Sequence, residues 1–90
     1  MITHLLINHC LNPECTSDYY AHRCCYGSLK VCAERLKGIC EEFADNGYTV
    51  TDAHDDPVDP GTIVEKVLNG ELACIQMDTG AHDIYTIVEI

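Results

Sequence analysis

The stretch SLKVCAERLKGICEEFADNG, residues 28–47, decides the fold of this chain. At about 100° per residue, its apolar residues fall within one arc of about 120°. Ser28 is a favoured helix N-cap, and Asn46-Gly47 is a typical helix stop. The pattern predicts a helix over residues 28–46 with one stripe in the core. That stripe comprises Leu29, Cys32, Ala33, Leu36, Ile39, Cys40 and Phe43.

The opposite face of the predicted helix is acidic. Glu34, Glu41 and Asp45 lie within about 40° of one another on the same helical wheel. A solvated face is the usual reason for such a pattern, and a surface for a basic partner is the alternative. The helix therefore offers one face to the core and one to water or to a partner.

The segments around this helix predict a small sheet. Residues 2–9 are apolar enough for a central strand, and residues 10–27, around Asn12-Pro13, predict a long irregular loop. A three-residue loop that contains Gly80 is typical of a β-hairpin. Further strands are therefore expected at residues 48–53, 71–78 and 82–90, with the last two joined through residues 79–81.

A second, short helix is predicted to begin at Asp59-Pro60, because Asp is favoured at the N-cap and Pro at the first helical position. Asn69-Gly70 would end it. The order β-α-β-α-β-β predicts a single α+β domain over residues 1–90, with the helices packed on a small mixed sheet. The buried face of the second helix is expected to comprise Ile63, Val64, Val67 and Leu68.

The charge balance is the strongest global feature of the sequence. Fifteen acidic residues face five basic ones, for a net charge of −10. Residues 38–90 hold twelve of the acids and only one base, Lys66. Such a surface should repel nucleic acid and anionic membranes and attract basic partners, although acidity also keeps a small protein soluble.

The start of the chain predicts a cytoplasmic protein. The segment MITHLLINHC lacks a basic region, and its apolar run is too short for a secretory leader or a membrane span. Cytoplasmic thiols stay reduced, and seven cysteines, an odd number, exclude a fully paired disulfide framework.

Residues 9–27 concentrate cysteine and histidine. A zinc-binding module could use Cys10, Cys15, Cys24, Cys25 or His22, but the spacing within the second pair is tighter than zinc sites use. A thiol enzyme could use Cys24 or Cys25, which precede a helix N-terminus. Small buried hydrophobic cysteines are the third interpretation. It is favoured for Cys32, Cys40 and Cys74, and it is also preferred over zinc and thiol chemistry for Cys10, Cys15, Cys24 and Cys25.

Other chemistry finds no support in the sequence. No phosphate-binding glycine motif, H-E-x-x-H or G-x-S-x-G is present. The acidic run at residues 52–60 lacks the spacing of a calcium loop. His4 and His9 are interpreted as structural histidines. We therefore expect a non-enzymatic protein without a cofactor or a bound metal.

The remaining hypothesis is a binding protein. In size and charge the chain resembles the small phage-encoded inhibitors of bacterial defence systems, including anti-CRISPR proteins, and no sequence motif carries a residue role over from them. Carboxylates can replace phosphates in a basic groove, so we expect an inhibitor that mimics nucleic acid. The expected partner-binding residues are Glu34, Glu41, Asp45, Asp52, Asp55, Asp56 and Asp59.

The expected partner is a basic surface on a protein or complex that handles nucleic acid, and not nucleic acid or a membrane itself. Tyr19, Tyr20 and Tyr26 form a second candidate contact surface. Exposed tyrosines and an unpaired strand edge would also permit a homodimer.

Overall fold

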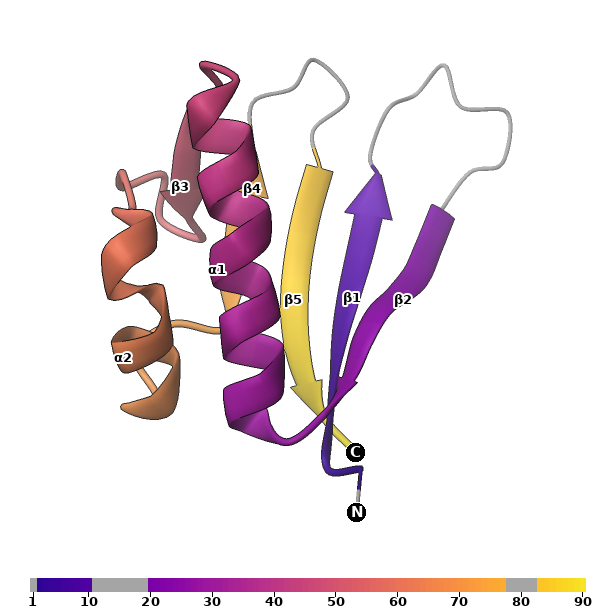
Figure 1. The fold of residues 1–90 in the computed structure, drawn as a ribbon. Coiled ribbons are helices and arrows are strands. Elements are labelled where there is room, and N and C mark those ends of the chain that lie inside the picture. Colours follow the sequence, from indigo (N-terminus) through magenta and orange to yellow (C-terminus); the bar gives the residue numbers. More distant parts are fainter. Residues whose placement is uncertain (1, 11–19, 78–82) are drawn as a thin grey trace.

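The computed structural model describes residues 2–10, 20–77 and 83–90, with only the backbone given for residues 10 and 20–24. The described residues do not include the predicted loop at 79–81, nor Cys15 or Tyr19. Two helices cover one face of a five-stranded sheet, as the α+β prediction requires (Figure 1). The elements are β1 His4–Cys10, β2 Tyr20–Gly27, α1 Leu29–Asp45, β3 Val50–Asp52, η1 Pro60–Thr62, α2 Ile63–Leu68, β4 Cys74–Met77 and β5 Asp83–Glu89.

The first helix follows the prediction closely. The Ser28 hydroxyl accepts a hydrogen bond from the Val31 amide at 3.2 Å, and Asn46 forms the C-cap. Gly47 then takes a φ of 86°, a backbone conformation that other residues rarely adopt. Five members of the predicted stripe are buried, and Leu29 and Phe43 pack against them partly buried. The local sequence is therefore sufficient to begin, orient and end α1.

The stripe of α1 packs on the inner face of the sheet, the face that carries Leu6, Ile75 and Met77. All three side chains are at least 98% buried. Burial of a large aliphatic side chain contributes about 1.5–3 kcal/mol, so this contact dominates the stability of so small a domain.

The second helix is shorter than its sequence pattern indicates. Asp59 caps η1 by accepting a hydrogen bond from the Gly61 amide at 3.0 Å, and α2 follows directly. Ile63 and Val67 are buried and Val64 is partly buried, but Leu68 is 46% exposed, so its predicted burial is wrong. Leu68 follows Val67 by about 100° of helical turn, which directs it away from α1.

Two predictions about the sheet are also wrong. Residues 20–27, expected within a loop, form β2, so the element order is β-β-α-β-α-β-β. The sheet, expected to be mixed, has the order β2-β1-β5-β4-β3 with every neighbouring pair antiparallel. β2 and β3 run in the same direction but lie at opposite edges. The crossover through α1 therefore joins strands that are not neighbours.

A β-bulge explains why β2 escapes detection. Leu6 pairs with Cys25 and Ile7 pairs with Arg23, so Cys24 has no opposite residue in β1. The extra residue interrupts the alternation of side chains that identifies a strand in a sequence. Beside it, β1 and β5 pair without interruption from His4–Glu89 to Cys10–Asp83.

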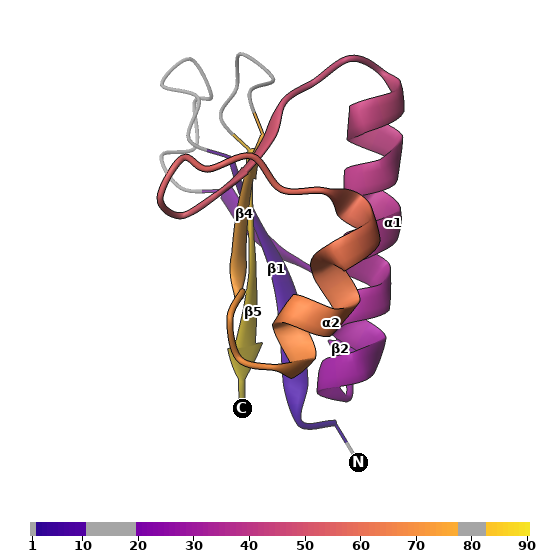
Figure 2. The same ribbon diagram turned by 90° about the vertical axis from the view of Figure 1, so that its left-hand side faces the viewer.

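The helices occupy a single layer. Figure 2 shows α1 and α2 on one side of the sheet, and no described helix on the other. The described parts of the chain contain no helix long and apolar enough to cross a membrane.

Leu36→Ala tests the packing of α1. Leu36 is fully buried, so its truncation leaves a cavity and should lower the free energy of unfolding by about 2–5 kcal/mol. Val31→Ala, on the same helix but 44% exposed, should change it by less than about 0.5 kcal/mol. Equilibrium unfolding in urea measures both. Equal losses in the two variants would contradict this packing.

Candidate partner-binding surface

The acidic face predicted for α1 is present in the structure. Glu34, Glu41 and Asp45 are exposed along the helix, on the side away from the buried stripe. Lys37 forms an ion pair with Glu41 at 3.8 Å, between side chains that are both well exposed. An exposed pair of this kind contributes little to stability, so Glu41 stays available to another cation.

Asp59 joins two of these carboxylates around a hollow. Glu41, Asp45 and Asp59 line a shallow depression of about 390 Å³ between α1 and η1, together with Lys37. Asp59 is distant from the helix in sequence and is brought there by its role as the cap of η1. We call Glu34, Glu41, Asp45 and Asp59 the helix group.

The remaining predicted residues, Asp52, Asp55 and Asp56, form a turn group elsewhere. Figure 2 shows that the turn after β3 projects on the side of the sheet opposite to α1. Asp55 has a φ of 63°, which fixes this turn in a shape that few residues other than glycine, Asn and Asp adopt. The structure therefore divides the predicted set into two groups on different sides of the sheet.

Asp52 has a structural role within the turn group. Its Oδ1 atom accepts hydrogen bonds from the backbone amides of His54 at 2.7 Å and Asp56 at 3.1 Å. These bonds from Asp56 and His54 hold the pKa of the Asp52 carboxyl below its ordinary value of 3.8. Asp52 thus shapes the turn that presents Asp55 and Asp56, both of which are exposed.

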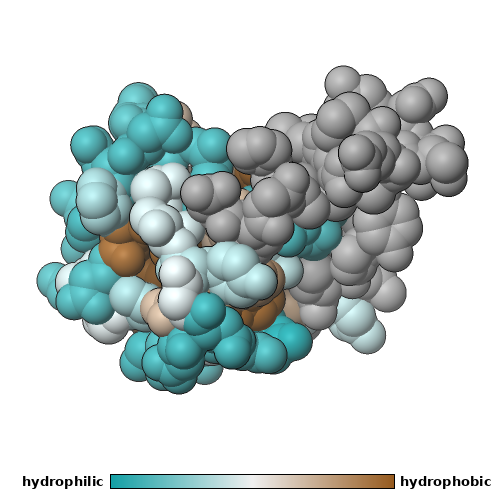
Figure 3. Space-filling view, turned by 90° about the horizontal axis from the view of Figure 1, so that it is seen from above, coloured by the Kyte–Doolittle hydropathy of each residue, from teal (hydrophilic) through white to brown (hydrophobic). Residues whose placement is uncertain are grey.

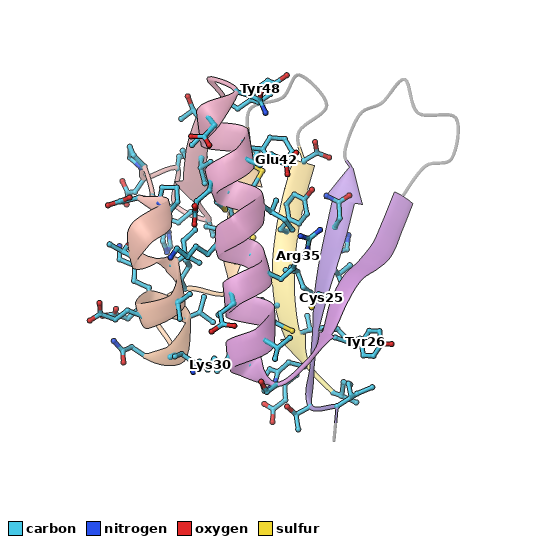
Figure 4. All side chains as sticks on the ribbon, viewed as in Figure 1. Cys25, Tyr26, Lys30, Arg35, Glu42 and Tyr48 are labelled. Carbon is cyan, nitrogen blue, oxygen red and sulfur yellow. The ribbon has the colours of Figure 1, made fainter. Side chains whose placement is uncertain are left out.

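A second hollow was not predicted from the sequence. It has a volume of about 290 Å³ and lies between the C-terminal half of α1 and β5. Phe43 contacts Tyr48 and Tyr85, with ring centroids 5.7 and 6.3 Å apart. In Figure 4, Arg35 reaches from α1 over the sheet, and Glu42 and Tyr48 lie toward the end of the helix. The lining residues are Arg35, Ile39, Glu42, Phe43, Asn46, Tyr48 and Tyr85.

The surface around the end of α1 is mainly hydrophilic. Figure 3 shows this end of the molecule, where hydrophobic residues occupy small areas between hydrophilic ones. Sequence periodicity could assign Phe43 to the core stripe. It could not indicate that Tyr48 and Tyr85, from two other segments, would contact the same ring.

The zinc interpretation finds little support in the strand register. Cys10 pairs with Tyr20, whereas Cys25 pairs with Leu6. Four residues of strand separate Cys10 from Leu6, about 13 Å, which is more than the ligands of one tetrahedral zinc ion span. The side chains of Cys10, His22 and Cys24 lie outside the described set, as does Cys15. Within that set, no three His, Cys, Asp or Glu residues are close enough to hold a metal.

The described cysteines include the two core residues expected on α1. Cys32 and Cys40 are fully buried, as predicted, whereas Cys74 is only partly buried and accepts a hydrogen bond from the Thr86 hydroxyl at 3.7 Å. Burial raises the pKa of Cys40 to about 12. Burial, followed by the nearby Cys25 thiol, raises the pKa of Cys32. Thiols in this state are protonated and weakly nucleophilic.

Comparison with known proteins adds no family to this description. No protein-family model matches the sequence, and neither curated proteins nor solved structures gave a significant match. What the acidic surface does must therefore follow from its charge, burial and geometry.

Asp52→Asn tests the turn group. The folded pKa of Asp52 is depressed, so its contribution to stability is present above pH 3.8 and is lost as the pH falls through the folded value. Asp52→Asn should therefore unfold at lower urea concentration at neutral pH and lose less stability on acidification than the unmodified protein. Asp56→Asn is the control, because the Asp56 side chain is exposed. An unchanged acid dependence in Asp52→Asn would contradict this role.

Alkylation rates test the state of the thiols. We expect iodoacetamide to modify Cys40 at least about tenfold more slowly than Cys25, because the Cys40 thiol is buried and protonated. Peptide mass spectrometry measures both rates in one sample. In urea, which unfolds the protein, the alkylation rates of Cys40 and Cys25 should converge. Rapid alkylation of Cys40 in the folded protein would contradict the burial described above.

Proposed function

We propose that this protein is a small, non-enzymatic inhibitor that binds a basic nucleic-acid-binding surface of a cytoplasmic partner protein. Its carboxylates take the places that phosphates occupy on that surface. The observation that supports this proposal is that four exposed carboxylates of the helix group lie along α1 and η1, with a single ion pair, Lys37–Glu41, among the described residues.

The helix group forms few ion pairs, although Lys30 and Lys37 lie beside it on the helical wheel of α1. Among the described residues, Lys37 lies within ion-pair distance of Glu41, and no cation lies that close to Glu34, Asp45 or Asp59. A protein that needed these carboxylates only for solubility could scatter them. Here three of them surround one hollow. A Lys or Arg side chain of a partner could enter that hollow and contact all three.

The helix also supplies a suitable shape. Glu34 and Asp45 are eleven residues apart on α1, which corresponds to about 17 Å along a straight helix. A convex helix that carries four carboxylates and two cations, Arg35 and Lys37, over this length can lie in a groove that normally holds a nucleic acid strand. Direct binding to nucleic acid is opposed by the same charges. In size and charge, the protein resembles the inhibitors that phages direct against bacterial defence complexes.

Two charge-reversal variants test the proposal. Glu41→Lys/Asp45→Lys changes the helix group, and Glu65→Lys/Glu71→Lys makes the same change in net charge on exposed residues outside it. The immobilised proteins are incubated with bacterial lysate at low and high salt. We expect the unmodified protein and the Glu65/Glu71 variant to retain a nucleic-acid-binding protein at low salt, and the Glu41/Asp45 variant to lose it.

Competition then separates mimicry from general electrostatic attraction. Double-stranded DNA or RNA added in excess should release the retained protein, because both ligands would occupy one basic surface. Equal loss of binding in the two variants would mean that only net charge matters. Retention that nucleic acid cannot reverse would rule out phosphate mimicry.

A further inference from the structure

Two of the described cysteines, Cys25 and Cys32, lie on facing sides of the junction between β2 and α1. Cys25 pairs with Leu6 of β1, and directly opposite residues of an antiparallel pair point to the same face of the sheet. Because Leu6 is fully buried on the face that the helices cover, Cys25 also points toward the helices, and it packs against the core. Figure 4 shows Cys25 beside the N-terminal half of α1.

The junction itself is tight. Cys32 occupies the first turn of α1 and belongs to its buried stripe, and only Ser28 separates α1 from β2. A Cβ atom added to Gly27 would lie 3.2 Å from Cγ1 of Val31, so the end of the strand lies against the turn that carries Cys32. The path of the chain therefore brings the two cysteines together.

The two thiols also interact directly. Burial has the largest effect in raising the pKa of Cys32, and the charge of a Cys25 thiolate and a hydrogen bond with the Cys25 side chain raise this pKa further. The pKa of Cys40, two turns further along the same stripe, is raised by burial alone. Cys25 is the more accessible member of the pair, because it is partly exposed whereas Cys32 is fully buried.

We propose that Cys25 and Cys32 form a reversible disulfide, with a low-molecular-weight disulfide such as oxidised glutathione as the oxidant. The bond requires the two sulfur atoms to approach to about 2.05 Å. Cys25 lies on an edge strand, so it has a neighbouring strand on one side only and more freedom to move toward α1 than a residue of a central strand has. Disulfides that form in a reducing compartment are usually transient, which agrees with a reversible bond.

The reaction takes two exchange steps. Cys25 releases its proton to water, and its thiolate attacks one sulfur atom of oxidised glutathione, from which a glutathione thiolate leaves. Cys32 then releases its proton, and its sulfur attacks Cys25 Sγ in the mixed disulfide and expels the second glutathione thiolate. Each released thiolate takes up a proton. Two protein thiols are thereby oxidised by two electrons, and one glutathione disulfide is reduced to two thiols.

The disulfide would link the edge strand β2 to the first turn of α1. A cross-link of this kind restricts the unfolded chain, so the oxidised protein should be more stable than the reduced protein. The helix group takes no part in the reaction. This proposal and the proposed function can therefore fail separately.

Equilibration with glutathione tests the proposal. The reduced protein is incubated without oxygen in mixtures of reduced and oxidised glutathione, and its free thiols are then blocked by alkylation. Trypsin cleaves after Lys30 and so places Cys25 and Cys32 in different peptides, and mass spectrometry identifies the disulfide that joins them. We expect the equilibrium constant for this disulfide to be at least about tenfold larger in the folded protein than in urea, because folding holds the two thiols together. By linkage, the oxidised protein should unfold at a higher urea concentration.

Single substitutions identify the thiols that react. Cys24→Ser is the matched control for Cys25→Ser, because it removes the adjacent thiol of the same tryptic peptide. The cross-link should persist in Cys24→Ser and should be lost in Cys25→Ser and in Cys32→Ala. Circular dichroism of each variant confirms that the fold is retained.

Three results would overturn the proposal. The first is that no disulfide joins the two peptides at any ratio of oxidised to reduced glutathione. The second is a cross-link that Cys25→Ser retains or that Cys24→Ser loses. The third is an equilibrium constant that is as large in urea as in the folded protein.

Discussion

The structure depends on one contact, between the apolar stripe of α1 and one face of the sheet. Leu36 and its neighbours on the helix are fully buried against Leu6, Ile75 and their neighbours on the strands. A chain of 90 residues has room for one such layer and little more. The consequence is an asymmetric molecule, in which both helices lie on one side of the sheet and the turn group projects from the other.

That asymmetry gives the two sides different physical properties. The helix group is exposed, and one of its four carboxylates, Glu41, has a cation within ion-pair distance among the described residues. The sheet face away from α1 carries the partly buried Leu5, Ile7, Ile84 and Val88 on its two long paired strands, β1 and β5.

The local sequence was sufficient to predict those features that depend only on residues close to one another along the chain. The caps and periodicity of α1, the Asp59-Pro60 start of η1 and the exposure of Glu41 and Asp45 all follow from short stretches. The edge strand β2 depends on pairing with β1 across a bulge, which no local alternation reveals. Leu68 is apolar, like the residues of the core, but it is exposed because the short α2 presents only one side to α1.

The candidate site was predictable in composition but not in arrangement. The sequence indicates an acidic helix face and an acidic turn, and both are present. It could not show that Asp59 joins Glu41 and Asp45, because that proximity requires η1 to pack on α1. Nor could it show that the turn projects from the opposite side, since the direction of the turn depends on the pairing of β3 with β4 and on the bridge between Thr51 and Pro57.

The order of the strands also affects biosynthesis. β5, the last strand along the chain, lies at the centre of the sheet between β1 and β4, and its longest pairing is with β1, the first. A nascent polypeptide emerging from the ribosome therefore holds β1 and α1 without the strand that unites them. Their apolar surfaces stay open until β5 is translated, and over that interval chaperones or premature aggregation compete with folding.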